Sequence, residues 1–321
     1  MTDWQPTADR AALWQRAELL QRTREFFNAR GVMEVTTPVM GAATVTDPNI
    51  NGIAVDYADP RSEARRWWLQ TSPEYPMKRL LAAGSGPIYQ IAPVFRHGER
   101  GHYHNPEFSL LEWYRPGFGY RELIGEVAEL LNAVLAPRAT QTIRYADAFS
   151  SILGVDPLTA TDEQLQSLVA TNGLGITGAD LDRDACLDLL MGALIAPRLG
   201  QGSWLFVTHF PVSQAALARL DPEDPRTAER FECFIDGVEV ANGFRELTDP
   251  QAQRARFEAD QAARRQRGET DPPAVDERLI AALESGMPEC SGVALGLDRL
   301  LMVALGAESI DRVMAFPLER A

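Results

Sequence analysis

The sequence predicts an α+β fold in which an antiparallel sheet is flanked by helices. Hairpin-connected strands alternate with helices along the chain, without the regular strand-helix-strand rhythm that builds a doubly wound parallel sheet. Asp236-Gly237 between two apolar runs is a strong signal for a two-residue hairpin turn. With 321 residues, 45% of them apolar, the chain is long enough to bury a large core.

Helices are expected where apolar residues recur at helical spacing between start and stop signals. The first runs over Thr7–Arg30 and ends at Gly31. A second has Ser72 as N-cap, Pro73 at its first position and Gly84 at its end. A charged helix covers Pro250–Arg267, and the run GVALGLDRLLMVALG reads as a strand leading into a final helix.

Strands are expected in short runs of apolar and β-branched residues with alternating character. These runs are Val32–Val35, 53–57, Trp67–Gln70, Ile88–Phe95, Glu107–Tyr114, Trp204–His209, Phe231–Ile235 and Val238–Phe244. Residues from about 120 to 200 are mostly helical in pattern. The chain is therefore expected to form one domain, 1–321, that carries a mostly helical insertion.

Composition points to a soluble cytoplasmic protein. No apolar run is long enough to span a bilayer, and no secretory signal pattern opens the chain. The three cysteines, Cys186, Cys233 and Cys290, have neither metal nor redox spacing, so they are expected to be buried small hydrophobes. A net charge of −14 disfavours broad binding to nucleic acid and would attract a partner that presents basic residues.

Taken one at a time, the candidate functional residues leave several readings open. There is no phosphate-binding loop of the Walker type, so ATP, if used, would be held by arginines and metal. His97, His102 and His104 match no zinc pattern and are expected to be incidental loop residues. His209 is expected to be structural.

The acidic residues carry more chemical information. Glu239 and Glu246 lie close together after the hairpin turn, where they suit Mg²⁺ or an ammonium group, or are solvated charges on an edge strand. Glu112 and Tyr114 share one face of an otherwise apolar strand, so the carboxylate needs a partner and is a candidate cation ligand. Arg299 opens a helix, where it can clamp a phosphate or form a salt bridge.

The order of these segments resembles the three motifs of class II aminoacyl-tRNA synthetases. FFNARGVMEVTTPVM resembles motif 1, whose Pro38 is implied to lie at a homodimer interface. VFRHGERGHYHNPEFSLLEWY resembles motif 2, and GVALGLDRLLMVALG resembles motif 3. TSPEYPMKRLL and EVANGFREL are similar to lysyl-tRNA synthetases. The resemblance covers nearly the whole chain.

Motif 1 begins about two dozen residues from the start, so no anticodon-binding OB-fold domain is expected before it. The phrases HYHNPEF, LEWYRP, EVANGF, GMPEC and SGVALG are most similar to the lysyl-tRNA-synthetase paralogues that modify elongation factor P. This resemblance implies an enzyme that activates (R)-β-lysine with ATP and Mg²⁺ and transfers it to elongation factor P, with tRNA an unlikely acceptor and no membrane partner.

The resemblance also implies site residues. Arg96, Glu239 and Arg299 would be catalytic, with Arg96 on the α-phosphate and Arg299 on the γ-phosphate. The implied ATP-binding residues are Arg96, His97, Gly98, Glu99, Asn105, Phe108, Glu239, Val240, Gly296 and Arg299. The implied substrate-binding residues are Ser72, Pro73, Glu74, Glu112, Tyr114, Asn242, Phe244, Glu246 and Ala294. Mg²⁺ would be held by Glu239 and Glu246.

Two positions depart from the lysyl-tRNA-synthetase pattern. Glu99 is displaced by one residue from the Arg-x-Glu spacing, and Ala294 stands where a glycine is usual. A methyl group at 294 would reshape the substrate site and favour β-lysine over α-lysine, and Ser72 in place of alanine would act in the same direction.

Three alternatives remain open. The chain could be a truncated lysyl-tRNA synthetase, an asparagine-synthetase-like amide ligase, or a catalytically inactive regulatory paralogue. The acidic residues argue against the second, and the intact set Arg96, Glu239, Glu246 and Arg299 argues against the third.

Overall fold

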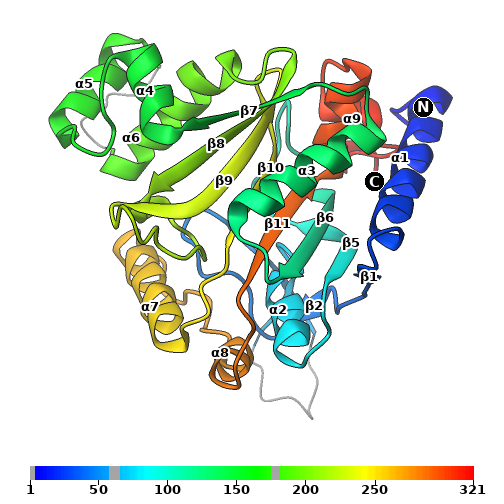
Figure 1. Ribbon diagram of the computed structural model, residues 1–321, viewed down its shortest axis with the longest axis horizontal. Helices are drawn as coiled ribbons and strands as arrows, with labels where there is room; N and C mark the ends of the chain where they lie inside the picture. Colours follow the sequence, from blue (N-terminus) through cyan, green and yellow to red (C-terminus); the bar gives the residue numbers. More distant parts are fainter. Residues whose placement is uncertain (1–3, 58–65, 175–180) are drawn as a thin grey trace. The chain divides into compact units, whose positions relative to one another are not determined.

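The computed structural model describes residues 4–57, 66–174 and 181–321 (Figure 1). The chain divides into two compact units. One contains the residues up to Gly119 together with Glu246–Ala321, and the other is Tyr120–Arg245. The expectation of a single domain over 1–321 stays a prediction.

The first unit is built on a sheet with the strand order β1-β5-β6-β11. Its strands are β1 (Met33–Glu34), β5 (Ile88–Phe95), β6 (Glu107–Pro116) and β11 (Cys290–Gly296). β6 pairs antiparallel with both β5 and β11, as the sequence predicted, whereas β1 is parallel to β5. The parallel edge arises because helix α2 (Glu74–Ala82) lies between β1 and β5 in the chain, and such a crossover returns the chain in its original direction.

A smaller sheet in the same unit has the order β2-β4-β3. Its strands are β2 (Met40–Gly41), β3 (Ile53–Val55) and β4 (Trp67–Leu69). The sequence predicted β3 and β4 but not β2, whose two residues are too short to leave a pattern.

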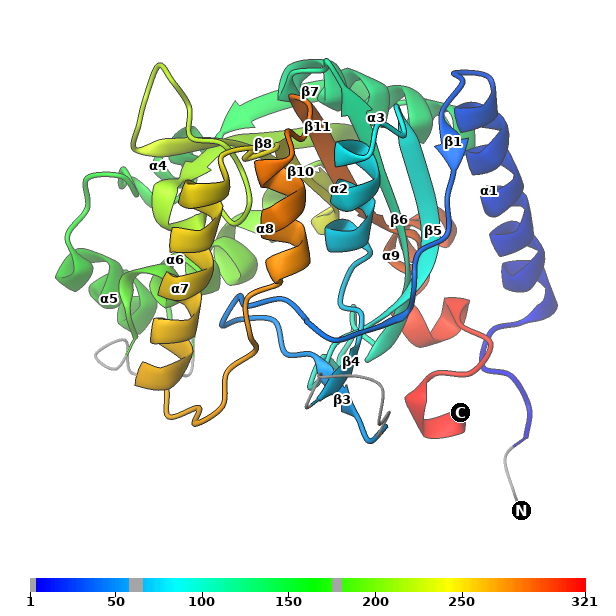
Figure 2. The same ribbon diagram turned by 90° about the horizontal axis from the view of Figure 1, so that it is seen from below.

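The other helices of this unit are α1 (Arg10–Asn28), α7 (Pro250–Gln266), α8 (Glu277–Glu284) and α9 (Leu297–Leu305), with 3-10 turns η5 (Ile310–Val313) and η6 (Leu318–Arg320). Helices α2, α8 and α7 stand side by side (Figure 2). Asp9, Asp249 and Asp276 cap α1, α7 and α8 by accepting backbone N–H groups, which explains where these helices begin. Helix α8 was not predicted, because it follows a Pro-rich stretch and is short.

Helix α1 covers one face of this sheet. The ring of Phe27 stacks on Tyr89 of β5 with centroids 4.4 Å apart and meets the edge of Trp113 of β6 at 5.3 Å. All three side chains are fully buried. Because side chains alternate along a strand, the neighbours of Trp113, which are Glu112 and Tyr114, lie on the opposite face.

The second unit has the strand order β10-β9-β8-β7. Its strands are β7 (Ala139–Arg144), β8 (Ser203–Pro211), β9 (Thr227–Ile235) and β10 (Val238–Arg245). β9 and β10 form the predicted hairpin, in which Asp236 and Gly237 have φ angles of 48° and 86°, as a two-residue turn of the primed type requires.

Helices of this unit precede β7 or connect it to β8. They are α3 (Tyr120–Val134), α4 (Tyr145–Leu153), α5 (Asp162–Thr171) and α6 (Arg183–Leu190), followed by η2 (Met191–Ile195) and η3 (Ala196–Arg198); η4 (Val212–Gln214) follows β8. Region 120–200 is therefore mostly helical, as predicted, but it also contains β7. The sequence missed β7, since its residues are exposed apart from a half-buried Ile143, and the strand pairs parallel to β8 through a helical crossover.

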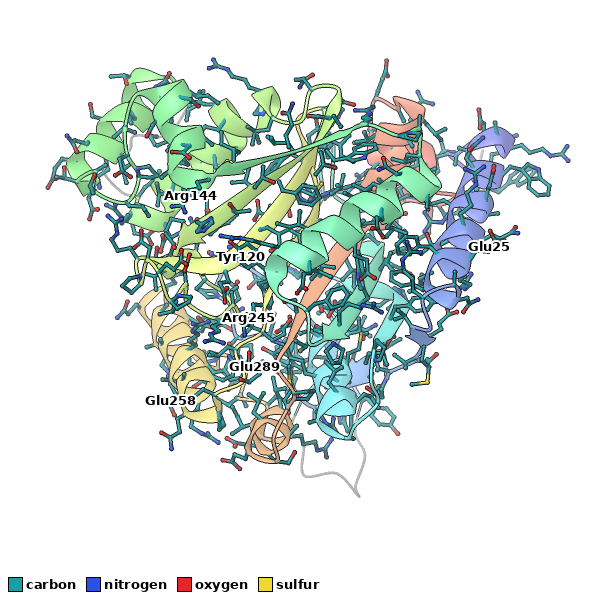
Figure 3. All side chains as sticks on the ribbon, in the orientation of Figure 1. Glu25, Tyr120, Arg144, Arg245, Glu258 and Glu289 are labelled. Carbon is teal, nitrogen blue, oxygen red and sulfur yellow. The ribbon has the colours of Figure 1, made fainter. Side chains whose placement is uncertain are left out.

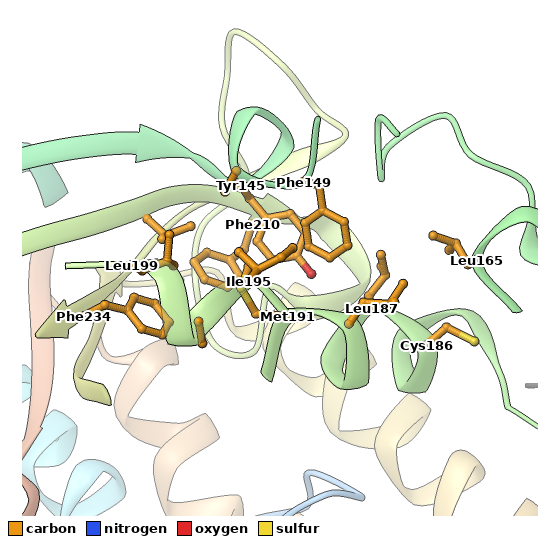
Figure 4. Close-up of a cluster of buried hydrophobic side chains, with 14 of the residues drawn as sticks. Tyr145, Phe149, Leu165, Cys186, Leu187, Met191, Ile195, Leu199, Phe210 and Phe234 are labelled. Atoms are coloured by element: carbon orange, nitrogen blue, oxygen red, sulfur yellow. The ribbon is translucent and has the colours of Figure 1, made fainter. Parts of the chain in front are cut away.

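Aromatic and aliphatic side chains from these helices and from β8 and β9 form the core of the second unit (Figure 4). Tyr145 stacks on Phe149 with centroids 4.7 Å apart and packs against Phe210 at 4.9 Å. Cys186, Cys233 and Cys290 are free thiols, and all three are buried, as expected.

Charged residues lie mainly on the surface. Glu25 on α1 and Glu258 on α7 are exposed (Figure 3). Across the described residues, no helix is both long and apolar enough to cross a membrane.

Candidate active site

The face of the first unit's sheet opposite α1 carries three of the predicted substrate-binding residues, which are Glu112, Tyr114 and Ala294. On adjacent strands Gln90, Glu112 and Ala294 are direct neighbours, and Tyr114 lies opposite Gly292. Residues paired in this way project from the same face of a sheet. Strand β11 places only the small residues Gly292 and Ala294 beside them, which leaves space on this face for the side chains of Glu112 and Tyr114.

Glu112 is buried and accepts two hydrogen bonds. The hydroxyl of Tyr114 donates to Oε1 at 2.5 Å, and the hydroxyl of Ser72 donates to Oε2 at 2.7 Å. Burial, assisted by the nearby Glu74 carboxylate, raises the pKa of Glu112 to about 7, although these two hydrogen bonds lower it. The expectation that a carboxylate in this strand would be buried and need partners is confirmed.

Ser72 connects the start of α2 to this carboxylate. Its Oγ accepts a hydrogen bond from the backbone N–H of Glu74 at 3.0 Å, as a helix-capping hydroxyl does, and donates its own proton to Glu112. Pro73 was predicted as the first helical residue, but it is the N-cap. Helix α2 therefore begins one residue later than predicted, at Glu74.

Lys78 lies between two of the predicted substrate-binding carboxylates. Its Nζ is 2.6 Å from Oε1 of Glu74, one helical turn earlier on α2, and 2.5 Å from Oε2 of Glu246. The side chains of Lys78 and Glu246 are both 1% exposed. We call Glu74, Lys78, Glu112 and Glu246 the acidic cluster.

The acidic cluster contains three carboxylates and one ammonium. Burial raises the pKa of Glu246 to about 8, against the opposing effect of Lys78. Burial lowers the pKa of Lys78, but Glu246 and Glu74 together raise it above its ordinary value. The two directions agree, because three carboxylates that share one cation keep it charged while competing with one another for ionisation.

Gly292 makes room for this arrangement. A Cβ atom at position 292 would come within 2.4 Å of Cε1 of Tyr114 and 2.5 Å of Oε1 of Glu246, closer than any side chain tolerates. Glycine is therefore required at 292. Ala294, two residues along the same strand, is half-buried beside Glu112, where its methyl group can limit the space for a substrate.

Motif 2 places the predicted nucleotide-binding residues at the end of the β5–β6 hairpin. The guanidinium of Arg96 lies 5.0 Å from the centre of the Phe108 ring, and its Nε donates to the carbonyl of Thr71 at 3.4 Å. Oε1 of Glu99 is 3.5 Å from Nη1 of Arg96. Glu99 therefore contacts this arginine although it is displaced by one residue from the Arg-x-Glu spacing. His97 and Gly98 are exposed in the loop.

Motif 3 positions Arg299 at the start of α9. Its Nη2 is 2.5 Å from Nε2 of His104, and its Nε donates to the carbonyl of Tyr103 at 3.2 Å. His104, expected to be incidental, is therefore a neighbour of the predicted γ-phosphate ligand. Gly296 lies directly beside the Arg299 side chain.

Asn105 is buried and has a structural partner on each side of its amide. It donates to the carbonyl of Glu107 at 2.7 Å and accepts from the backbone N–H of Leu318 at 3.1 Å. These contacts tie the motif 2 loop to the C-terminal segment, so Asn105 shapes the loop as well as being a predicted ATP contact.

Four predicted residues belong to β10 of the second unit. Glu239 is half-buried, whereas Val240 is buried, which leaves its main chain as the group that can meet a nucleotide. Asn242 accepts a hydrogen bond from Nε of Arg230 at 3.2 Å. Phe244 packs on a small cluster of buried alanines.

Glu239 and Glu246, the two predicted Mg²⁺ ligands, have different surroundings in the structure. The carboxylate of Glu246 contacts the ammonium of Lys78, and its role as a magnesium ligand stays a prediction. In the part of the chain that the structure describes, no group of three or more His, Cys, Asp or Glu side chains is arranged to hold a metal. Glu239 is the predicted ligand that we carry forward.

Sequence reasoning missed Lys78 and Gly292. Lys78 follows Glu74 at the i, i+4 spacing, which usually marks an exposed helix pair. Gly292 was noticed as part of motif 3, but its contact with Glu246 depends on residues 46 positions apart in the chain.

Comparisons with known proteins agree with this geometry. The family model for class II tRNA synthetases (D, K and N) matches residues 2–320. This chain belongs to the class II tRNA synthetase family. The α+β fold predicted from the motifs is the fold of that family, and the resemblance drawn from motifs 1 to 3 is confirmed.

Three similar curated proteins are named elongation factor P--(R)-β-lysine ligase. The protein of that name from Vibrio cholerae is 50% identical over 322 residues, covering 100% of this chain and 99% of the relative. The Proteus mirabilis protein is 50% identical over 323 residues, covering 100% and 99%. The Klebsiella pneumoniae protein is 48% identical over 320 residues, covering 99% and 98%.

Proposed function

We propose that this chain is a ligase that activates (R)-β-lysine with ATP and transfers it to the ε-amino group of a specific lysine of elongation factor P. The names of the full-length relatives support the acceptor and the amino acid. The acidic cluster supports the substrate class from physical grounds alone.

The observation that carries the proposal is the charge of the acidic cluster. Glu74, Glu112 and Glu246 supply three carboxylates, and Lys78 balances one of them. When all three carboxylates are ionised, two negative charges are in excess, and these suit a substrate with two ammonium groups, such as a lysine isomer, because buried carboxylates are stable when paired with cations. A neutral side chain such as that of asparagine would leave both charges unpaired.

The adenylation step needs alignment and charge neutralisation more than a strong base. The substrate carboxylate attacks the α-phosphorus of ATP, the bond to the β-phosphate bridge breaks, and pyrophosphate leaves. Arg96 is suited to the α-phosphate and Arg299 to the γ-phosphate, while Phe108 offers a ring on which adenine can stack. Mg²⁺, with Glu239 as its proposed ligand, would add positive charge at the phosphates.

Transfer completes the reaction. The deprotonated ε-amine of the acceptor lysine attacks the carbonyl carbon of the adenylate, an amide bond forms, and AMP leaves with the electrons of the mixed anhydride bond. The net charge of −14 suits a protein acceptor with basic residues more than it suits tRNA.

The chain is also proposed to act as a homodimer through motif 1. Leu13 and Trp14 of α1 and Met33 of β1 are apolar residues that expose 36%, 64% and 50% of their surface. Large apolar residues left exposed on the elements around motif 1 suit a subunit interface.

ATP–pyrophosphate exchange with (R)-β-lysine, α-lysine and asparagine in parallel tests the activation step. The proposal expects strong exchange with (R)-β-lysine, weaker exchange with α-lysine and none with asparagine. Strong exchange with α-lysine together with charging of tRNA would instead identify a truncated lysyl-tRNA synthetase. Absence of exchange with all three amino acids would leave only a regulatory role.

A further inference from the structure

Lys78 lies deep in the acidic cluster and none of the predicted steps uses it. A fully buried lysine is rare and costly unless its ammonium is paired. Here the Nζ atom contacts one oxygen of Glu74 at 2.6 Å and one oxygen of Glu246 at 2.5 Å. Neither the cap of α2 nor its packing requires a charge at this position, since Met77 and Leu81 beside it are buried apolar residues.

Glu246 reaches this lysine from a different part of the chain. Its backbone N–H donates to the carbonyl of Cys290 at 3.0 Å, which fixes the residue beside the start of β11. Its side chain then divides its oxygens between two neighbours. Oε2 contacts Lys78, and Oε1 lies over Gly292 next to the ring of Tyr114.

The two oxygens of Glu246 are not equivalent, because Oε2 is ion-paired with Lys78 at 2.5 Å. The side chain is 1% exposed, and within the described residues Oε1 accepts no hydrogen bond. A buried acceptor left without a donor costs about 1–3 kcal/mol. A substrate ammonium that reached Oε1 would remove this cost. It would lie on the sheet face that also carries Glu112 and Ala294.

We propose that Lys78 is a positioning residue for substrate recognition, which holds Oε2 of Glu246 so that Oε1 is presented to a substrate ammonium group. This inference rests on the proposed function, because it assigns the ligand of Oε1 to the diamino acid. Lys78 also contacts Glu74, but the proposal assigns its effect on substrate binding to Glu246. It does not touch the substrate.

The proposal predicts a specific change in kinetics for Lys78→Met. Without the ammonium, Oε2 of Glu246 loses its ion pair and the buried carboxylate binds a proton more readily, so its charge-assisted bond to the substrate weakens. Such a bond corresponds to about a 30-fold effect. The KM for (R)-β-lysine in pyrophosphate exchange is expected to rise about 30-fold, while the KM for ATP and kcat change less than about threefold.

A double variant separates this role from a purely structural one. Lys78→Met combined with Glu246→Gln removes both charges of the pair, so that neither partner is left buried without the other. If Lys78 acts only through Glu246, the KM of the double variant equals that of Glu246→Gln alone, because the two changes are not additive. Arg79→Met, an exposed neighbour on α2, is the matched control and should behave as wild type.

The outcomes are distinct. Wild-type protein that shows no exchange with any diamino acid contradicts the proposed function itself. Wild-type exchange with an unchanged KM in Lys78→Met overturns the role of Lys78. So does a double variant whose KM exceeds that of Glu246→Gln by tenfold or more, since Lys78 would then act by another route. Burst titration of adenylate gives the active fraction of each variant, so misfolding cannot imitate a change in KM.

Discussion

Replacing Glu112 by glutamine separates the cost of burying a charge from the binding of the substrate. The carboxylate is 3% exposed and is held by hydroxyl groups of Tyr114 and Ser72, which a glutamine side chain of the same length can still contact. Glutamine cannot ionise, so the variant removes the titration of this residue while its shape and most of its contacts remain.

The size of the effect follows from the shift in pKa. The pKa of Glu112 is about 7 in the folded protein, against 4.5 for an unperturbed glutamate. Between these values the folded state binds more protons than the unfolded chain, so the free energy of unfolding falls as the pH rises. A span of about 2.5 pH units at about 1.4 kcal/mol per unit gives a loss of about 3 kcal/mol. Most of this loss falls between pH 5 and pH 8.

Urea unfolding at pH 5 and pH 8 measures this loss in both proteins. Relative to wild type, Glu112→Gln should gain about 2–3 kcal/mol of stability on going from pH 5 to pH 8, while its KM for (R)-β-lysine rises at least tenfold. Glu258→Gln, at an exposed position on α7, is the control and should follow wild type at both pH values. Parallel pH profiles for wild type and Glu112→Gln would refute the idea that this carboxylate is buried at a cost.

Three other predictions concern the same site. The KM for (R)-β-lysine should fall as the pH rises from 6 to 8.5. Glu112 and Glu246, with pKa values of about 7 and 8, must ionise to hold ammonium groups. A KM independent of pH would count against both carboxylates as ligands. Ala294→Gly should shift the ratio of exchange rates toward α-lysine by about tenfold or more, since one methyl group changes discrimination by about 1–3 kcal/mol; unchanged selectivity would exclude this methyl group as the determinant. Phe108→Ala should raise the KM for ATP about tenfold through lost stacking, with the KM for the amino acid unchanged. An unchanged KM for ATP with a raised KM for the amino acid would place Phe108 outside the adenine site.

Local patterns predicted most of the strands that build the site. Alternation along β6 correctly placed Glu112 and Tyr114 on one face, because the period of a strand fixes which side chains point together. The Asp236-Gly237 turn fixed the hairpin of β9 and β10 for a similar reason. Strand β7 escaped prediction, because an exposed edge strand with one half-buried apolar residue leaves no such period.

Contacts between distant segments were beyond the reach of these patterns. The pairing of Lys78 with Glu246 joins residues 168 positions apart, and a lysine four residues after a glutamate ordinarily suggests an exposed helix. The partnership of Arg299 with His104 likewise depends on how motif 3 packs against the motif 2 loop. The sequence shows which residues carry charge, but only the packing of distant segments shows which of these charges are buried.

The family resemblance supplied what neither pattern nor packing provides. Roles such as phosphate binding by Arg96 came from motif order, and the geometry beside Phe108 and Glu99 is compatible with that role. The assignment of (R)-β-lysine and elongation factor P depends on relatives that are about half identical over their full length.

The most direct test of the central claim is the intact mass of elongation factor P after incubation with this protein, ATP and (R)-β-lysine. The account predicts that one lysyl residue is added to a single lysine side chain of the factor, that AMP forms in equal amount, and that bulk tRNA offered in the same mixture stays uncharged. Unmodified factor together with aminoacylated tRNA would contradict the account and identify tRNA as the acceptor.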